Sequence, residues 1–266
     1  MTPQPISLLS KSDILSVLSP ATQAKLTDIE IHQTLPSTND RLWQRFEQGL
    51  DMPAICISEE QTAGRGRRGD QWQSPASGNL YLSLFWPFSA NRVHNGLSIA
   101  IGVALINSLK SQGINGLKIK WPNDILYEKQ KLAGILVESR FRNRQYTVVG
   151  IGLNFKLPTA TKSKIDQPTT SLQQFCTEIP CRSTLAGHII QNMIETIELF
   201  QARGLESFLP LWPHYDALDN ADILLINDTQ TLAAKACGIN EKGELRYQHN
   251  GDLHTLTSGL TRIRFA

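Results

Sequence analysis

One glycine- and arginine-rich stretch has the composition of an anion-binding loop. Residues 64–69 read GRGRRG, in which the glycines are Gly64, Gly66 and Gly69 and the arginines are Arg65, Arg67 and Arg68. Glycine lets the backbone approach a ligand closely and present its N–H groups, and arginine supplies a planar, permanently charged group that fits phosphate or carboxylate. We expect this loop to bind an anion and, because its charges repel one another, to become ordered only when it does so. A solvated basic surface loop is the alternative.

The same letters match the G-x-G-x-x-G pattern of dinucleotide-binding loops, but their surroundings do not. That pattern requires a strand before the loop, a helix after it and an acidic residue about 20 positions later. Residues 54–62 are typical of a strand, whereas Ser74-Pro75 and Gly78 interrupt any helix after the loop. No acidic residue lies between Asp70 and Asp124. The context therefore disfavours a dinucleotide site.

Other polar groups stand at expected strand ends and turns. They are Ser37-Thr38-Asn39, Glu60-Gln61, the KWPND segment 120–124, the KLAG segment 131–134 and the GIGLN segment 150–154. A lysine at 131 can reach an anion as a point charge, and Asp124 can hold Mg²⁺ or position a ribose. Each also has a plainer interpretation: a solvated lysine, an Asx-turn and, for Ser37, a helix N-cap.

Composition limits the classes of function. The chain has 266 residues, 41% of them hydrophobic and 19% charged, and a net charge of +2, so no global field attracts nucleic acid or membrane. The four cysteines lack metal-ligand spacing, which indicates buried free thiols in a reducing compartment. Neither a secretory leader nor a run of about 18 apolar residues is present. We expect a soluble cytoplasmic protein.

Hydrophobic periodicity predicts alternating helices and strands. Expected helices cover 10–19, 37–49 with Ser37 as N-cap, 97–113, and 183–204 with a cap at each end; expected strands cover 28–35, 54–62, 79–88 and 145–155, with two or three more within 117–141. After Pro213 the pattern changes to short segments separated by turns, which is typical of a small β-barrel. We therefore expect two domains, 1–219 and 220–266. Acidic and basic residues balance within 221–266, which argues against a nucleic-acid-binding barrel.

The ordered set of these motifs resembles the biotin protein ligases, also called biotin–[acetyl-CoA-carboxylase] ligases. It comprises STND, EEQTAGRGRRGDQW, NLYLSLFW, KWPNDI, KLAGILVES and GIGLN, followed by a C-terminal TSGLTRIR, and it spans roughly residues 11–266. The resemblance implies an α+β fold. Its catalytic domain would contain a mixed sheet, as in class II aminoacyl-tRNA synthetases, and a small SH3-like barrel would follow.

The resemblance also implies roles for individual residues. Biotin contacts fall on Ser37, Thr38, Asn39, Gln61, Gly64, Arg65, Gly66, Arg67, Lys131, Gly134 and Gly152; ATP or adenylate contacts fall on Arg67, Arg68, Trp72, Asn123, Asp124, Lys131 and Asn154. Lys131 and Arg67 are the expected catalytic residues. Apolar walls for the biotin ring and chain are expected from Trp72, Ala133 and Gly134.

The activity implied has two steps. Biotin and ATP, which carries Mg²⁺, give biotinyl-5′-AMP and pyrophosphate, and a lysine of a biotin carboxyl carrier domain of acetyl-CoA carboxylase or a related carboxylase then accepts the biotinyl group. A carboxylate that attacks phosphorus is already ionised, so the first step requires positioning and charge neutralisation rather than a base. No histidine motif or nucleophile elbow is present in the sequence, in agreement with this chemistry.

Three alternatives remain open at this stage. Some members of the family carry an N-terminal DNA-binding domain and act as biotin-responsive repressors, but here the catalytic pattern begins near Lys11, so we expect no DNA binding. A lipoate–protein ligase would have a triple glycine and a downstream histidine after the loop. A biotin-binding protein without catalysis is the third alternative.

A homodimer formed through a sheet edge, at 117–127 or near Val148, is left open.

Overall fold

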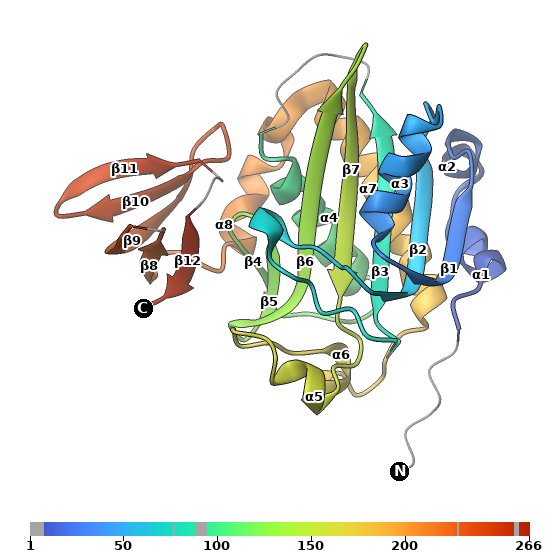
Figure 1. Ribbon diagram of the computed structural model, residues 1–266. Helices are drawn as coiled ribbons and strands as arrows, with labels where there is room; N and C mark the ends of the chain where they lie inside the picture. The colour runs from blue at the N-terminus through green and yellow to red at the C-terminus, as the bar shows by residue number, and fades with distance from the viewer. Residues whose placement is uncertain (1–7, 77, 89–94, 228, 258–260) are drawn as a thin grey trace.

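The computed structural model describes residues 8–76, 78–88, 95–227, 229–257 and 261–266. Residues 258–260, which belong to the TSGLTRIR motif, lie outside this range. The main body is built on one seven-stranded mixed sheet, whose strands follow the spatial order β1-β2-β3-β7-β6-β5-β4 (Figure 1). The strands are β1 (Ile29–Leu35), β2 (Ala54–Gln61), β3 (Leu80–Pro87), β4 (Leu117–Lys120), β5 (Asp124–Tyr127), β6 (Gln130–Phe141) and β7 (Gln145–Leu153). Only β1 and β2 pair in parallel; the other neighbours are antiparallel.

Helices cover the two faces of this sheet unequally. Helices α4 (Leu97–Lys110) and α7 (Arg182–Arg203) pack together on one face, and α1 (Lys11–Val17) lies against α7. On the other face, α3 (Thr38–Glu47) contacts β2, β3 and β7. The part of that face over β6 and β7 is left to a loop rather than a helix (Figure 1).

Residue types explain which helix takes which place. Nearly all residues of α4 are buried, as its apolar sequence predicts. Helix α3 starts where expected, because the Ser37 hydroxyl accepts a hydrogen bond from the backbone N–H of Asp40 (3.4 Å). It ends before Gly49, whose φ of +101° favours glycine.

Side chains alternate between the two faces along β7, and along β6 after the irregular pairing at residues 131–133, and this alternation shapes the face that α3 leaves open. Ile135 on β6 and Ile151 on β7 point into the core beneath α4 and α7. The residues between core positions point to the opposite face; on β7, Tyr146 and Val148 pack against α3, and Gly150 and Gly152 lie beyond it on the open part. Small residues therefore form a shallow bed in the middle of the open face.

The C-terminal part is a separate five-stranded antiparallel sheet, which confirms the all-β prediction. Its strands are β8 (Asp222–Ile226), β9 (Thr231–Ile239), β10 (Leu245–His249), β11 (Asp252–Leu256) and β12 (Arg262–Phe265), in the order β11-β10-β9-β8-β12. The Trp121 indole donates a hydrogen bond to the Gly243 carbonyl (2.8 Å), so the two sheets are joined by a buried contact. The expected boundary at residue 220 stays a prediction.

Short helices complete the connections. They are α2 (Pro20–Lys25), α5 (Thr159–Lys162), α6 (Leu172–Phe175), α8 (Trp212–Tyr215) and the 3₁₀ turns η1 (Arg67–Gly69), η2 (Gly204–Ser207) and η3 (Leu209–Leu211). Among the helices in the described part of the chain, none combines the length and apolarity needed to cross a membrane.

Two local expectations are wrong. The first is the N-terminal cap of α7: the capping position is Cys181, which makes no side-chain capping bond, while the Ser183 hydroxyl accepts a hydrogen bond from the Ser10 N–H (2.9 Å). A tertiary partner thus competes for the serine that the sequence offers as a cap. The second concerns the cysteines, which are all free, but only Cys56 is buried.

Candidate functional site

The open face of the sheet carries a cleft of about 400 Å³. Its floor is β6 and β7, one end lies at the start of α3, and the opposite wall comes from β12 of the C-terminal sheet. Except for Gly64 and Ala133, every residue for which the sequence predicts a ligand contact lines this cleft. The residues that line it as predicted are Ser37, Thr38, Asn39, Gln61, Arg65, Gly66, Arg67, Arg68, Trp72, Asn123, Asp124, Lys131, Gly134, Gly152 and Asn154. The fold thus gathers motifs that are far apart in the chain, whereas their roles in binding stay predictions.

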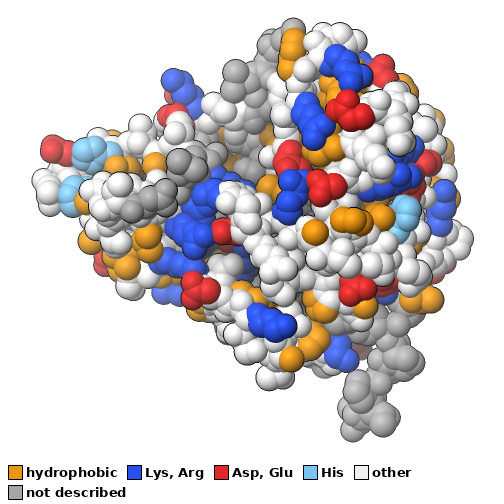
Figure 2. Space-filling model, in the orientation of Figure 1, with side chains coloured by type: hydrophobic (Ala, Val, Ile, Leu, Met, Phe, Trp, Pro, Cys, Tyr) orange, Lys and Arg blue, Asp and Glu red, His pale blue; other side chains and the backbone are white. Residues whose placement is uncertain are grey.

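Positive charge is concentrated in this cleft. Eight basic and three acidic side chains line it, although the whole chain has a net charge of only +2. Figure 2 shows Lys and Arg side chains gathered in the hollow between the C-terminal sheet and the main body. Low-dielectric walls focus such a field, so the cleft favours a ligand with several negative charges.

The floor is shaped by glycines that leave room for an indole ring. Gly134 and Gly152 are cross-strand partners. A Cβ atom at Gly152 would lie 2.4 Å from Cε2 of Trp72, and one at Gly134 would lie 2.9 Å from its Cζ3. The Trp72 ring therefore lies directly on the glycine bed, and Lys131 Nζ lies 5.1 Å from its centre.

The expectation that Ala133 forms a wall of the site is wrong. Ala133 is fully buried and belongs to the core on the opposite face. Adjacent residues of a strand point to opposite faces, so Ala133 and Gly134 cannot both face a ligand. Only Gly134 is on the cleft side.

The arginine-rich loop turns tightly above this floor. Its backbone closes on itself through Gly66 N–H to Asp70 O (2.6 Å) and Trp72 N–H to Gly64 O (2.9 Å). Extended chain follows η1 instead of a helix, in agreement with the case against a dinucleotide loop. The structure gives Gly64 a packing role, since a Cβ there would lie 2.5 Å from the Ser74 hydroxyl and 2.7 Å from the Trp72 carbonyl.

The cationic end of the cleft holds its charged groups by specific contacts. Arg67 donates to the Asn123 side-chain oxygen (3.3 Å), and Lys131 Nζ lies 2.8 Å from Asp124 Oδ1. Burial and the neighbouring charge of Arg68 lower the pKa of Arg67, and burial lowers that of Lys120. Cations held in a partly dehydrated site favour an anion that compensates their charge.

The end beside α3 is polar but carries neutral groups. The backbone N–H of Thr38 donates to Gln61 Oε1 (2.9 Å), and Gln61 Nε2 donates to the Ser74 hydroxyl (2.9 Å). Ser37, Thr38 and Asn39 are all nearly buried. This end suits an uncharged ring with hydrogen-bonding groups, so the cleft can bind a ligand that is neutral at one end and anionic at the other.

The predicted set omits two arginines of the C-terminal sheet. Arg262 and Arg264 line the cleft. Arg262 donates to Asp70 Oδ1 (2.6 Å) and Arg264 to the Asp166 carbonyl (2.8 Å). The alternation T-R-I-R places both arginines on one face of a strand, and this pattern could have predicted a basic surface. The equal numbers of acidic and basic residues in the whole segment 221–266 obscured that prediction.

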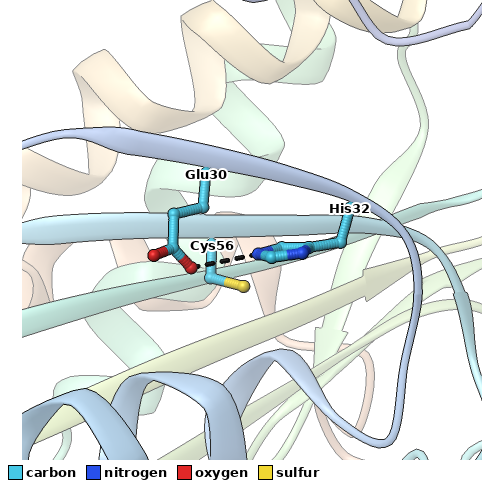
Figure 3. Close-up of side chains that lie close together, drawn as sticks. All are labelled: Glu30, His32 and Cys56. Atoms are coloured by element: carbon cyan, nitrogen blue, oxygen red, sulfur yellow. Dashed lines mark hydrogen bonds and ion pairs between the residues drawn. The ribbon is translucent and has the colours of Figure 1, made fainter.

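A second cluster of metal-type ligands lies outside the cleft and does not suit a cation. Glu30 and His32 of β1 and Cys56 of β2 converge, with one ligand atom from each within 4.8 Å of the others (Figure 3). Arg41 and Arg45, however, contact the Glu30 carboxylate at 2.9 and 3.2 Å. Burial raises the pKa of Cys56 to about 12, so its thiol stays protonated. The cluster is an ion-pair network between β1 and α3.

Comparisons with known proteins agree with this geometry. Residues 31–154 match the model of the biotin/lipoate A/B protein ligase family. The chain is 34% identical to the bifunctional ligase/repressor BirA of Escherichia coli strain K12, over 99% of this chain and 81% of that protein. It is also 34% identical to the biotin–[acetyl-CoA-carboxylase] ligase of Mycobacterium tuberculosis, over 59% of each chain. A biotin protein ligase from Aquifex aeolicus, solved in complex with biotin and ATP, shares the fold with a TM-score of 0.76 at 22% identity, over 91% of this chain and 99% of that one.

Proposed function

Since this chain belongs to the biotin protein ligases, within the biotin/lipoate A/B protein ligase family, we propose that its cleft joins biotin to ATP and then to a protein lysine. The observation that carries the proposal is the division of one cleft into a neutral polar end at α3 and a cationic end at β12. Biotin has a neutral ureido ring and a carboxylate tail, and ATP is a polyanion. The two substrates together match the polarity of the cleft.

In the first step the biotin carboxylate attacks the α-phosphorus of ATP, and pyrophosphate leaves. A bond forms between a carboxylate oxygen of biotin and the α-phosphorus, and the bond between the α-phosphorus and the oxygen that bridges to the β-phosphate breaks. No proton has to be removed. The contribution of the protein is alignment and charge neutralisation. Arg67, Arg68 and Lys131 line the cleft as cations, which supports a role for them in neutralising the negative charge that develops in this step.

Magnesium is proposed to enter with ATP. Asp124 lines the cationic end, and its carboxylate already lies against Lys131 Nζ. Carboxylate oxygen is a ligand type that Mg²⁺ prefers, and the ion usually retains several waters and phosphate oxygens. Asp124 therefore suits one position in its coordination sphere.

In the second step the amine of an acceptor lysine attacks the acyl carbon of the adenylate. An amide forms, AMP leaves and the amine loses a proton. The relative named biotin–[acetyl-CoA-carboxylase] ligase supports a biotin carboxyl carrier domain as the acceptor.

Mass spectrometry of an acceptor tests the proposal directly. The protein, biotin, ATP and a biotin carboxyl carrier domain are combined, and one lysine of the carrier is expected to gain the mass of a biotinyl group. Reactions without ATP, or with lipoate in place of biotin, are the matched controls. Absence of a mass gain with biotin and ATP would contradict the assignment, and a gain with lipoate alone would favour the lipoate ligase alternative.

DNA binding requires a separate test, because relatives that match over most of this chain are named ligase/repressors. We propose that this chain does not act as a repressor. A gel shift with DNA from a biotin-synthesis operator, in the presence of biotin and ATP, is expected to leave the DNA unshifted. A specific complex would contradict this expectation.

A further inference from the structure

Glu138 of β6 is a charged side chain beside the neutral end of the cleft that no binding motif singles out. It lies on the α3 side of the sheet, and its carboxylate accepts hydrogen bonds from Asn39 Nδ2 (2.8 Å) and Trp43 Nε1 (3.3 Å). Arg65 lies 3.3 Å from the other carboxylate oxygen. Three donors from α3 and the arginine-rich loop thus hold the carboxylate in one place.

This contact fixes the orientation of the Asn39 amide. A carboxylate only accepts hydrogen bonds, so the amide must turn its nitrogen toward Glu138. The amide oxygen then lies on the side of Gly150, where a Cβ would be only 2.3 Å from Oδ1. Asn39 and Gly150 both line the cleft, so the oxygen is presented at the neutral end.

Ser83 of β3 leaves that oxygen incompletely satisfied. Its fully buried hydroxyl lies 2.7 Å from Thr38 Oγ1 and 2.6 Å from Asn39 Oδ1 but has one proton to give. An amide oxygen can only accept, so the 2.6 Å contact requires Ser83 to give its proton to Asn39 Oδ1, while Thr38 Oγ1 donates its own proton to Gln61 Oε1 (3.2 Å). Asn39 Oδ1 has a second lone pair, which can accept an N–H from a ligand.

We propose that Glu138 is a positioning residue that turns the Asn39 amide oxygen toward a ring N–H of the ligand. The inference rests on the proposed function, in which that N–H belongs to the ureido ring of biotin. Glu138 does not itself contact the ligand in this scheme. Its contribution is selectivity for a ring that donates a hydrogen bond.

The test compares biotin and two methylated analogues in two proteins. Dissociation constants are measured by calorimetry for biotin and for biotin methylated at one or the other ureido nitrogen, with wild-type protein and with Glu138→Gln. One methylated analogue is expected to bind wild type about tenfold more weakly than biotin, the scale of one hydrogen bond. In Glu138→Gln the ratio should fall toward one, because a glutamine amide can donate as well as accept and no longer fixes the orientation of Asn39.

The matched control is Asp40→Asn. Asp40 is the other carboxylate partner of Arg65, and its side chain is nearly half-exposed. Its loss should leave the ligand ratio unchanged, so an equal fall in both variants would trace the effect to Arg65 and overturn the proposal. Thermal melting of each variant separates ligand selectivity from loss of the fold.

A second variant keeps the proposal testable if Glu138→Gln does not fold. Ser83→Ala removes the competing donor, so the ligand ratio should be at least as large as in wild type; a smaller ratio would overturn the proposal. If Glu138→Gln keeps the same ratio of dissociation constants as the wild type, that result would also overturn the proposal, and it would leave the proposed function intact. Failure of the wild-type protein to bind biotin would instead contradict the proposed function itself.

Discussion

At the scale of single residues, Lys131 and Asp124 form an ion pair that is largely shielded from solvent. Their side chains are 14% exposed and lie 2.8 Å apart. Lys131 is also placed over the Trp72 ring. The Lys131 ammonium group therefore interacts with both the Asp124 carboxylate and the Trp72 ring. A phosphate or carboxylate of a ligand would have to compete with Asp124 for this cation.

Removal of this cation should slow adenylate formation. We expect Lys131→Ala to lower the rate by about 10²–10³-fold, roughly 3–4 kcal/mol, because preorganised charge is lost where negative charge develops. Pyrophosphate release with biotin and ATP measures this step. Lys25→Ala is the control, since Lys25 pairs with Glu198, which lies outside the cleft; equal rates in wild type and Lys131→Ala would contradict the role.

The sequence identified residues whose signal is local and missed those whose partners are distant. Glycine, arginine and turn residues within short motifs predicted most of the cleft lining. Glu138 and Ser83 lie within the KLAGILVES and NLYLSLFW motifs, but their residue types did not mark them as site residues, because their importance comes from contacts with α3 across the sheet. The error at Ala133 had a different cause: two neighbouring residues of one strand were assigned to the same face.

At the scale of elements, β6 and β7 supply a floor that has no side chains at Gly134, Gly150 and Gly152. A single added methyl group should disturb it. In Gly152→Ala the new Cβ would meet the Trp72 ring at 2.4 Å, so the indole must move.

We therefore expect Gly152→Ala to weaken binding of ATP or the adenylate by about tenfold or more, with a smaller effect on the melting temperature. Calorimetry with a non-hydrolysable adenylate analogue measures the first quantity. A double-mutant cycle with Trp72→Ala isolates the cause, since the penalty should shrink when the indole is already absent. A penalty of equal size in both backgrounds would contradict displacement of Trp72.

The arginine-rich loop is the second element with a testable property. We expect trypsin to cleave after Arg67 or Arg68 more slowly once biotin and ATP are bound, because bound anions compensate the charges and order the loop. Cleavage near Arg142, on the distant β6–β7 turn, provides the internal control. Uniform rates at both places with and without ligands would count against ordering of the loop by its ligand.

Element prediction succeeded where periodicity and caps agreed. Helix α3 and the strands around it follow from a capping serine, a terminal glycine and alternating apolar residues. The cap of α7 failed because Ser183 has a partner far away in the chain. The short helix α2 has too few residues for a periodic signal.

At the scale of the whole molecule, the network of Glu30 ties an edge strand to a helix of the cleft. Burial alone would raise the pKa of Glu30, but hydrogen bonds from Arg41 and His32 and the charge of Arg45 lower it to about 2. A depressed pKa in the folded state means that the ionised form stabilises the fold above the ordinary value of 4.5. This contribution disappears as pH falls from about 4.5 to about 2.

Glu30→Gln should therefore lower the free energy of unfolding at pH 7 by about 1–3 kcal/mol. The difference from wild type should shrink as pH approaches 2, where the wild-type carboxyl is itself becoming protonated. Urea denaturation at several pH values measures both quantities. A difference that stays constant from pH 7 to pH 2 would show that ionisation is not its cause.

The bond between Arg262 and Asp70 connects residues 192 positions apart and brings β12 to the loop. Translation delivers these partners at different times: the loop and the glycine bed emerge first, and the arginines of β12 follow after most of the chain has been made. A nascent chain that has reached residue 256 would already contain the loop but not the cationic wall it meets. A chain shortened before β12 would therefore keep the loop and lose the wall that faces it, including the Arg262 partner of Asp70.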